Sequence, residues 1–344
     1  VEIDGERVLA ASCQRVATDG MIVHSATERA TKARAMVMEL LVADQPRRTD
    51  SHDPSSQLWH YAEEQQVEHS RFPGKKAPHP DSSHPAIAVN MDACIQCNLC
   101  VRACREVQVN DVIGLAGRGA DAHIIFDFGD DMGASTCVGC GECVQACPTG
   151  ALMPKTVLDD SQKLAITPDK QVASVCPYCG VGCQLNFHVK GEKIVAVTGR
   201  EGPANKSRLC VKGRYGFDYI DNPQRLTVPL IRRDAVPKSA SLPFDPATPL
   251  THFREASWDE ALTRAASGFS DIKQAHGASA LAGFGSAKGT NEEAYLFQKL
   301  IRQGFGHNNV DHCTRLCHAS SVSALLENVG SGAVTATFNE IENA

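Results

Sequence analysis

Twelve of the fifteen cysteines in this chain fall into three closely spaced groups. The first two groups share the spacing C-x2-C-x2-C-x3-C, and the third reads C-x2-C-x3-C with a fourth cysteine after 26 intervening residues (184–209). In chain order the groups are Cys94, Cys97, Cys100 and Cys104; Cys137, Cys140, Cys143 and Cys147; and Cys176, Cys179, Cys183 and Cys210. Since four thiolates hold one four-iron cluster, the sequence predicts three 4Fe-4S clusters that conduct electrons in series.

Disulfides and structural zinc are the alternative explanations for so many cysteines. Thiols packed at two- and three-residue intervals are typical of metal ligands rather than of disulfide partners. A zinc site needs only one tetrad, and the same triple spacing is seldom repeated in zinc proteins. Because thiolates kept for clusters require a reducing compartment, we expect the protein in the cytoplasm.

Composition limits the partners of the chain. Its 344 residues allow two or three domains, and the net charge of −6 with no block of Lys or Arg argues against a nucleic-acid surface. No run approaches the roughly 18 apolar residues of a membrane span. The chain opens at Val1 in the middle of a pattern and stops at Ala344 just after a helix-like stretch, so we expect both ends to be cut.

Patterning predicts an α/β multidomain chain. We expect a helix over 27–43 and a short one near 57–67, a hairpin around Lys190-Gly191-Glu192, and helices that open at the capping boxes beginning with Ser257 and Thr290. Short strands at 280–285 and near Val310, and a helix from Ser320, complete a strand–helix alternation typical of a parallel α/β layer. The predicted segments are 1–45, a small-domain remnant; 46–88, a proline-rich linker; 89–158 and 170–232, which carry the cysteines; and 250–344, the start of an α/β domain. Five histidines of the linker are expected to face solvent: His52, His60, His69, His79 and His84.

The paired C-x2-C-x2-C-x3-C runs resemble bacterial-type ferredoxins. In that module the fourth cysteine of each run serves the cluster of the other run. The resemblance therefore implies one cluster held by Cys94, Cys97, Cys100 and Cys147, and a second held by Cys137, Cys140, Cys143 and Cys104. The chain departs from the pattern in having Arg105 where a proline would follow Cys104.

The third group has a different resemblance. Val175-Cys-Pro-Tyr-Cys-Gly-Val-Gly-Cys183, followed by Leu209-Cys-Val-Lys-Gly-Arg214, resembles the N-terminal cluster domain of the molybdenum or tungsten bis-pterin oxidoreductases, which include formate dehydrogenases and nitrate reductases. In that family a lysine two residues after the last cysteine bridges the cluster and one pterin. The resemblance thus implies that Lys212 relays electrons.

Two further stretches resemble parts of the same family. The segment 309–322 resembles the metal-ligand loop of formate dehydrogenases, which implies that Cys317 coordinates the metal and that His318 orients formate or handles a proton. A soft thiolate suits molybdenum or tungsten, and an imidazole titrates near neutral pH. Cys313, one helical turn away, is expected to be structural. The segment 288–293 resembles a pterin dinucleotide site, which implies that Lys288 and Asn291 contact a bis-molybdopterin guanine dinucleotide.

The order of segments resembles the catalytic (alpha) subunit of soluble NAD-dependent formate dehydrogenases. Residues 5–43 resemble the end of a plant-type 2Fe-2S domain, with Cys13 at the position of its last ligand. The other three ligands would lie upstream of Val1 in the intact parent chain. No cysteine occurs between Cys13 and Cys94, so the His/Cys-ligated cluster of many relatives cannot form in the usual way.

The resemblance implies a reaction and its partners. Formate would lose a hydride at the molybdenum or tungsten centre and leave as carbon dioxide. Electrons would then pass through the clusters toward diaphorase partner subunits that bind flavin and NAD. Three alternatives remain at this stage: another bis-pterin enzyme such as a nitrate reductase, a cluster-carrying scaffold like the large peripheral-arm subunit of complex I, and an iron-only hydrogenase. Cys317 with His318, and Lys212, favour formate dehydrogenase over the scaffold, and the motif at 176–183 does not fit the hydrogenase. The sequence does not decide between molybdenum and tungsten or fix the physiological direction.

Overall fold

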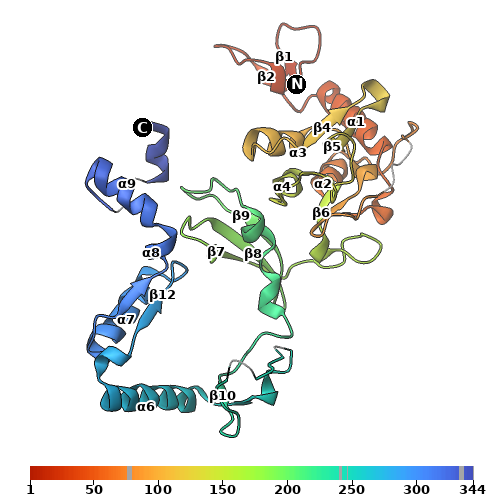
Figure 1. Ribbon diagram of the computed structural model, residues 1–344. Helices are drawn as coiled ribbons and strands as arrows, with labels where there is room; N and C mark the ends of the chain where they lie inside the picture. The colour runs from red at the N-terminus through yellow and green to blue at the C-terminus, as the bar shows by residue number, and fades with distance from the viewer. Residues whose placement is uncertain (76–79, 240–241, 246, 333–336, 344) are drawn as a thin grey trace. The chain divides into compact units, whose positions relative to one another are not determined.

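The computed structural model describes residues 1–75, 80–239, 242–245, 247–332 and 337–343, with short strands and helices throughout (Figure 1). Residues 76–79 of the expected linker, His79 among them, and residues 333–336 and 344 of the expected last domain lie outside this description. The chain divides into two compact units, residues 1–176 with 183–217 and residues 177–182 with 218–344. Each unit is a mixture of α and β elements.

The first unit begins with a short antiparallel pair and a helix. Strands β1 (Glu2–Ile3) and β2 (Val23–His24) pair with each other, and α1 (Glu28–Ala43) follows. The hydroxyl of Thr27 accepts the backbone N–H of Ala30, which caps the helix at its start. The helix predicted over 27–43 is therefore confirmed.

The segment expected to be a linker is packed against α1. It contains α2 (Gln57–Glu64), and the side chain of Trp59, only 2% exposed, contacts Val42. The indole Nε1 of Trp59 donates to Ser51 Oγ at 3.1 Å, so the polar edge of the buried ring is satisfied. The part of this segment that forms α2 is therefore packed against α1.

Two of the histidines expected in solvent are instead enclosed. The side chain of His52 is 12% exposed, and its Nε2 lies 3.1 Å from Asp92 while its Nδ1 lies 2.8 Å from the carbonyl of Gln162. His84 is 7% exposed, and its Nδ1 accepts the backbone N–H of Ile87 at 3.1 Å. The expectation of solvent-exposed rings was wrong here because each ring nitrogen named has a partner inside the fold.

The first two cysteine groups surround one core. Strands β3 (Ile87–Val89) and β6 (Leu152–Pro154) pair antiparallel at its base, and short helices α3 (Leu99–Arg102) and α4 (Glu142–Ala146) carry cysteines of the two runs. The long insert before Cys137 holds the antiparallel hairpin of β4 (Ile113–Ala116) and β5 (His123–Phe126). The buried residues of this core are Ile87, Val89, Cys100, Val101, Cys104, Val112, Ile113, Ile124, Phe126, Met132, Cys143 and Leu152.

A three-stranded antiparallel sheet completes the first unit. Its strands are β7 (Lys170–Val175), β8 (Gln184–Lys190) and β9 (Lys193–Gly199), in that order. The β8–β9 turn is the predicted hairpin, with Gly191 at φ +58°. The short helix α5 (Val211–Tyr215) follows the last cysteine of the third group.

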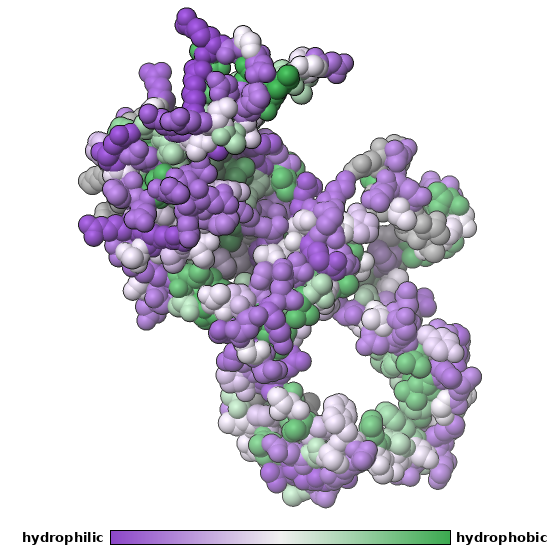
Figure 2. All heavy atoms as spheres, turned by 180° about the vertical axis from the view of Figure 1, so that it is seen from behind, coloured by the Kyte–Doolittle hydropathy of each residue, from purple (hydrophilic) through white to green (hydrophobic). Residues whose placement is uncertain are grey.

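The second unit carries the predicted parallel pair. Strands β12 (Gly283–Gly285) and β13 (Val310–His312) are parallel, and the helix α7 (Asn291–Lys299) lies between them in sequence. The remaining elements are the antiparallel pair β10 (Leu230–Arg232) and β11 (Phe253–Glu255), and the helices α6 (Trp258–His276), α8 (Thr314–Cys317) and α9 (Ala319–Val329). The side chains of Ser257 and Thr290 cap α6 and α7, and at Thr290 both bonds of the predicted capping box are present. Hydrophobic residues are visible at the surface around α7 and β12 in Figure 2. No helix in the described ranges has both the length and the apolar character needed to cross a membrane.

Candidate metal centres

The first candidate centre is a cavity lined by four thiols. These are Cys94, Cys97, Cys100 and Cys147. Three cysteines of the first run thus share one cavity with the last cysteine of the second run, because α3 packs against α4. This is the ligand set that the ferredoxin-type crossing implies.

The second candidate centre gathers the other four cysteines of the module. Burial is the main cause that raises the pKa of Cys137, Cys140 and Cys143, and Cys104 adds an electrostatic contribution to each rise. Cys104 and Cys143 belong to the same hydrophobic core, and Cys137 packs against it. The N–H of Val112 donates to Cys104 Sγ at 3.3 Å, a hydrogen bond of the kind that tunes cluster potentials.

The two runs repeat one backbone conformation. In the first run Gln96 and Asn98 have φ of 57° and 60°, and the corresponding Gly139 and Gly141 of the second run have φ of 66° and 73°. This left-handed geometry turns backbone N–H groups toward sulfur: those of Gln96 and Gly139 donate at 3.4 Å to the cysteine two residues earlier. The repeat seen in the sequence is thus also a repeat in structure.

The donor set and its surroundings fit four-iron clusters. Burial raises the pKa of Cys100 to about 12 and that of Cys143 well above its ordinary value, so both are protonated thiols at neutral pH while no metal is bound. Cluster assembly must displace these protons, since only thiolates ligate iron. The buried hydroxyl of Tyr215, whose pKa burial raises, has no hydrogen-bond partner in the described part of the chain and lies near Cys143. A cluster sulfur would supply an acceptor for such a group.

The third group is divided between the two units. Cys176, Cys183 and Cys210 belong to the first unit and Cys179 to the second. Within the first unit the backbone N–H of Cys176 donates to the carbonyl of Cys183 at 2.8 Å, and Cys183 and Cys210 line one cavity with Lys206. Along the described ranges no group of three or more His, Cys, Asp or Glu residues forms a site for a single metal ion.

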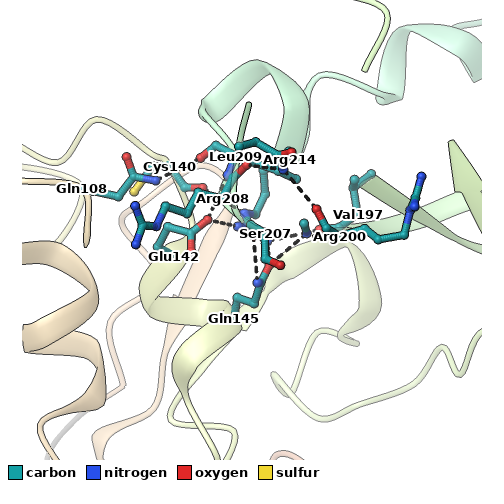
Figure 3. A network of polar contacts seen from close by, with 12 residues as sticks. Gln108, Cys140, Glu142, Gln145, Val197, Arg200, Ser207, Arg208, Leu209 and Arg214 are labelled. Atoms are coloured by element: carbon teal, nitrogen blue, oxygen red, sulfur yellow. Dashed lines mark hydrogen bonds and ion pairs between the residues drawn. The ribbon is translucent and has the colours of Figure 1, made fainter. Parts of the chain in front are cut away.

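A buried ion pair joins the second and third groups, and the sequence patterns gave no role to its members. Arg214, from α5, and Glu142, which lies between Cys140 and Cys143, form a salt bridge with side chains 3% and 8% exposed (Figure 3). Glu142 also accepts the backbone N–H of Leu209 at 3.0 Å. A charged residue inside the spacing of a cluster motif is the sequence signal that points to such a contact, because burial beside a cluster requires a partner.

The residues of the predicted catalytic centre lie at a helix junction. Cys317 is the last residue of α8, His318 stands between α8 and α9, and both are exposed. The imidazole of His318 makes no capping hydrogen bond to α9. Cys313 Sγ accepts the backbone N–H of Ala287 at 3.2 Å, which gives this cysteine a structural contact.

A cavity of about 480 Å³ lies beside β12, β13 and the start of α7. Its lining includes Gly285, Ser286, Gly289 and the strand residues Val310 to His312. The cavity therefore lies at the ends of parallel strands next to a helix N-terminus, the position at which phosphate groups bind in α/β folds. Lys288 extends elsewhere, since its Nζ donates to the carbonyl of Tyr178 at 2.7 Å. Asn291, the first residue of α7, is exposed, and Lys212 is exposed on α5.

Three family models match the chain. A 4Fe-4S dicluster domain matches residues 93–151, the molybdopterin oxidoreductase Fe4S4 domain matches residues 169–222, and molybdopterin oxidoreductase matches residues 225–344. These are the domains of the molybdopterin oxidoreductase family, so the chain is an oxidoreductase sequence of that family with iron–sulfur domains.

Known proteins with similar sequences are 32% identical to this chain. "Probable oxidoreductase YjgC" of Bacillus subtilis (strain 168) is 32% identical over all of this chain and 37% of its own length. "Putative formate dehydrogenase SH0748" of Staphylococcus haemolyticus (strain JCSC1435) is 32% identical over 81% of this chain and 30% of its own length. The chain thus spans about a third of the length of these curated relatives. A solved NAD+-reducing [NiFe]-hydrogenase aligns over 42% of this chain and 64% of its own with 26% identity and a TM-score of 0.38, a similarity too low to support a conclusion.

Proposed function

We propose that this chain is part of the catalytic subunit of a molybdenum- or tungsten-dependent formate dehydrogenase. The observation that carries the proposal is the exposed pair Cys317 and His318 at the α8–α9 junction, in a chain with three cluster motifs. Relatives named as formate dehydrogenases share 32% of their aligned residues with it. Formate is therefore the substrate to test first.

Each named residue has a proposed part in the reaction. When bound, the bis-pterin guanine dinucleotide centre supplies a two-electron acceptor for formate. The Cys317 thiolate holds its metal, and the His318 imidazole orients formate and takes up a proton. Lys212, two residues after Cys210, would relay electrons between the third cluster and a pterin, and Lys288 and Asn291 stay candidates for the dinucleotide site. The contact of Lys288 with Tyr178 suggests that it supports the third cysteine loop as well.

We further propose the path beyond the third cluster. Electrons pass through the two clusters of the ferredoxin-like module to a 2Fe-2S centre that includes Cys13, which is exposed in this structure. Partner diaphorase subunits with flavin and NAD receive them, in the cytoplasm. The crossed cavity of Cys94, Cys97, Cys100 and Cys147 supports two separate clusters in the module.

The test uses the full-length protein, prepared without air and with its metal content measured. Formate should bleach the iron–sulfur absorbance of the wild type. Cys317→Ser should lose bleaching by formate but keep bleaching by dithionite, because its clusters remain intact. Cys313→Ser is the matched control one turn earlier: its hydroxyl still accepts the N–H of Ala287, so formate should still bleach the clusters.

Two results would contradict this function. Full turnover of formate by Cys317→Ser would remove the metal-ligand assignment. The second result is a metal-loaded wild type in which formate does not bleach the clusters but nitrate reoxidises them after reduction. This would favour a nitrate reductase.

A further inference from the structure

One residue is bonded to cysteines of two different cluster groups. The backbone N–H of Arg214 donates to the carbonyl of Cys210 at 3.1 Å, in the third group. The side-chain Nε of the same arginine donates to the carbonyl of Cys140 at 2.9 Å, in the second group. A continuous chain of covalent and hydrogen bonds therefore runs from one ligand residue to the other through a single side chain.

The guanidinium is held on every side. Its Nε and NH2 contact Cys140 and Glu142, and its NH1 donates to Gln145 Oε1 at 2.7 Å and to the carbonyl of Val197 at 3.4 Å (Figure 3). Gln145 Oε1 also accepts the backbone N–H of Gly199. Since a buried charge is stable only with such partners, the network fixes the guanidinium beside the loop of the second run.

The backbone packing of α5 against the two groups is equally close. A methyl group at Gly141 would lie 2.4 Å from Arg214 Cδ and 2.6 Å from the Tyr215 hydroxyl, so glycine is required there. A methyl at Gly213, on the same helix, would lie 3.6 Å from Cys176 Sγ of the third group. Helix α5 is thus inserted between the second and third cysteine groups within the first unit.

We propose that Arg214, neutralised by Glu142, is the positioning residue for electron transfer between the third cluster and the module cluster of Cys104, Cys137, Cys140 and Cys143. The third cluster is oxidised by one electron, and this module cluster is reduced by one electron. The two electrons from substrate oxidation pass singly and in succession. The cluster in the Cys94 cavity is the later member of the series. This inference rests on the proposed electron relay, and it does not depend on formate being the donor.

The charge of the pair predicts shifts of opposite sign in reduction potential. A guanidinium stays charged in proteins, so Glu142→Gln leaves an uncompensated positive charge beside the second-run cluster and should raise its potential. Gln145→Glu places a second carboxylate at the same guanidinium, on an exposed residue, and should lower that potential. The double change Glu142→Gln with Arg214→Gln removes both charges and should return the potential toward that of the wild type.

The measurement is a dithionite titration of the full-length protein followed by electron paramagnetic resonance, with iron counted in every variant. The signal that shifts should be the one that Cys140→Ser alters. Lys190→Gln, which breaks the exposed pair with Asp169 in the same unit, should shift no signal. If formate fails to bleach the clusters while these potentials shift, formate is not the electron donor, but the proposed role of Arg214 still holds.

Three results would overturn the proposal. One is an unchanged potential in both Glu142→Gln and Gln145→Glu with all clusters present. Another is a shift confined to the cluster of the Cys94 cavity. The third is a loss of clusters in Glu142→Gln while Gln145→Glu keeps them at unaltered potential, which would make the pair purely structural.

Discussion

Cys143 of the first unit and Cys317 of the second unit, both proposed metal ligands, lie in opposite environments. In the first unit Cys143 is 5% exposed and belongs to a hydrophobic core shared with other ligand candidates. In the second unit Cys317 is exposed between helices of which α9 buries no residue, and the neighbouring Leu316 is 91% exposed. Most cysteines of the first two groups thus lie in or against a packed core, whereas the candidate catalytic pair has no packed surroundings among the described residues.

Among the variants that test this difference in burial, Cys143→Ser is expected to have the largest effect on cluster content and stability. It removes one ligand of the second-run cluster from the core, so that cluster should be lost and the unit should unfold more easily. Iron analysis should show one cluster fewer than in Cys317→Ser, which should keep all three. Equal iron content in the two variants would mean that buried and exposed cysteines do not differ in this way.

Several elements of the fold were predictable from local sequence. The spacing of the cysteines, the caps at Ser257 and Thr290 and the β8–β9 hairpin depend on residues close together in the chain, and the structure agrees with them. The parallel pairing of β12 with β13 followed from strand–helix alternation.

The missed features depend on residues far apart in the chain. Arg214 and Glu142 are separated by 72 positions, and His52 and Asp92 by 40. Apart from the place of Glu142 inside a cluster motif, single positions carry no signal for such pairs, because each charged residue alone is typical of a solvated surface. The burial of Trp59 was hidden in the same way by the polar, proline-rich residues around it.

The two tryptophans of the chain offer a matched test of packing, and its expected effect is of intermediate size. Trp59→Ala removes a side chain that is 2% exposed and should lower the free energy of unfolding by about 3–5 kcal/mol. Trp258→Ala removes one that is 68% exposed and should change it by no more than about 0.5 kcal/mol. Urea unfolding followed by circular dichroism measures both, and a larger loss in Trp258→Ala would reverse the comparison.

The smallest effect is a pH dependence confined to the first unit. The hydrogen bond from His52 to Asp92 is the main cause that raises the pKa of this histidine above its ordinary value. The folded state then holds the proton more tightly than the unfolded state, so the stabilisation is complete below about pH 6.5 and is lost as pH rises through the raised pKa. His84 contributes in the opposite direction: burial lowers its pKa, so the folded state binds the proton less tightly than the unfolded state and loses stability as pH falls below about 6.5.

The variant His52→Gln should therefore make stability fall less steeply as pH rises above about 6.5, whereas His84→Gln should make stability fall less steeply as pH drops below about 6.5. Thermal unfolding followed by loss of the iron–sulfur absorbance at several pH values separates the two slopes. His60→Gln is the control, because its ring lies at the surface, 3.4 Å from Glu64, with 67% of the histidine side chain exposed. A slope in His52→Gln equal to that of the wild type would show that the pair with Asp92 holds no extra proton, and the buried histidine would then act through packing alone.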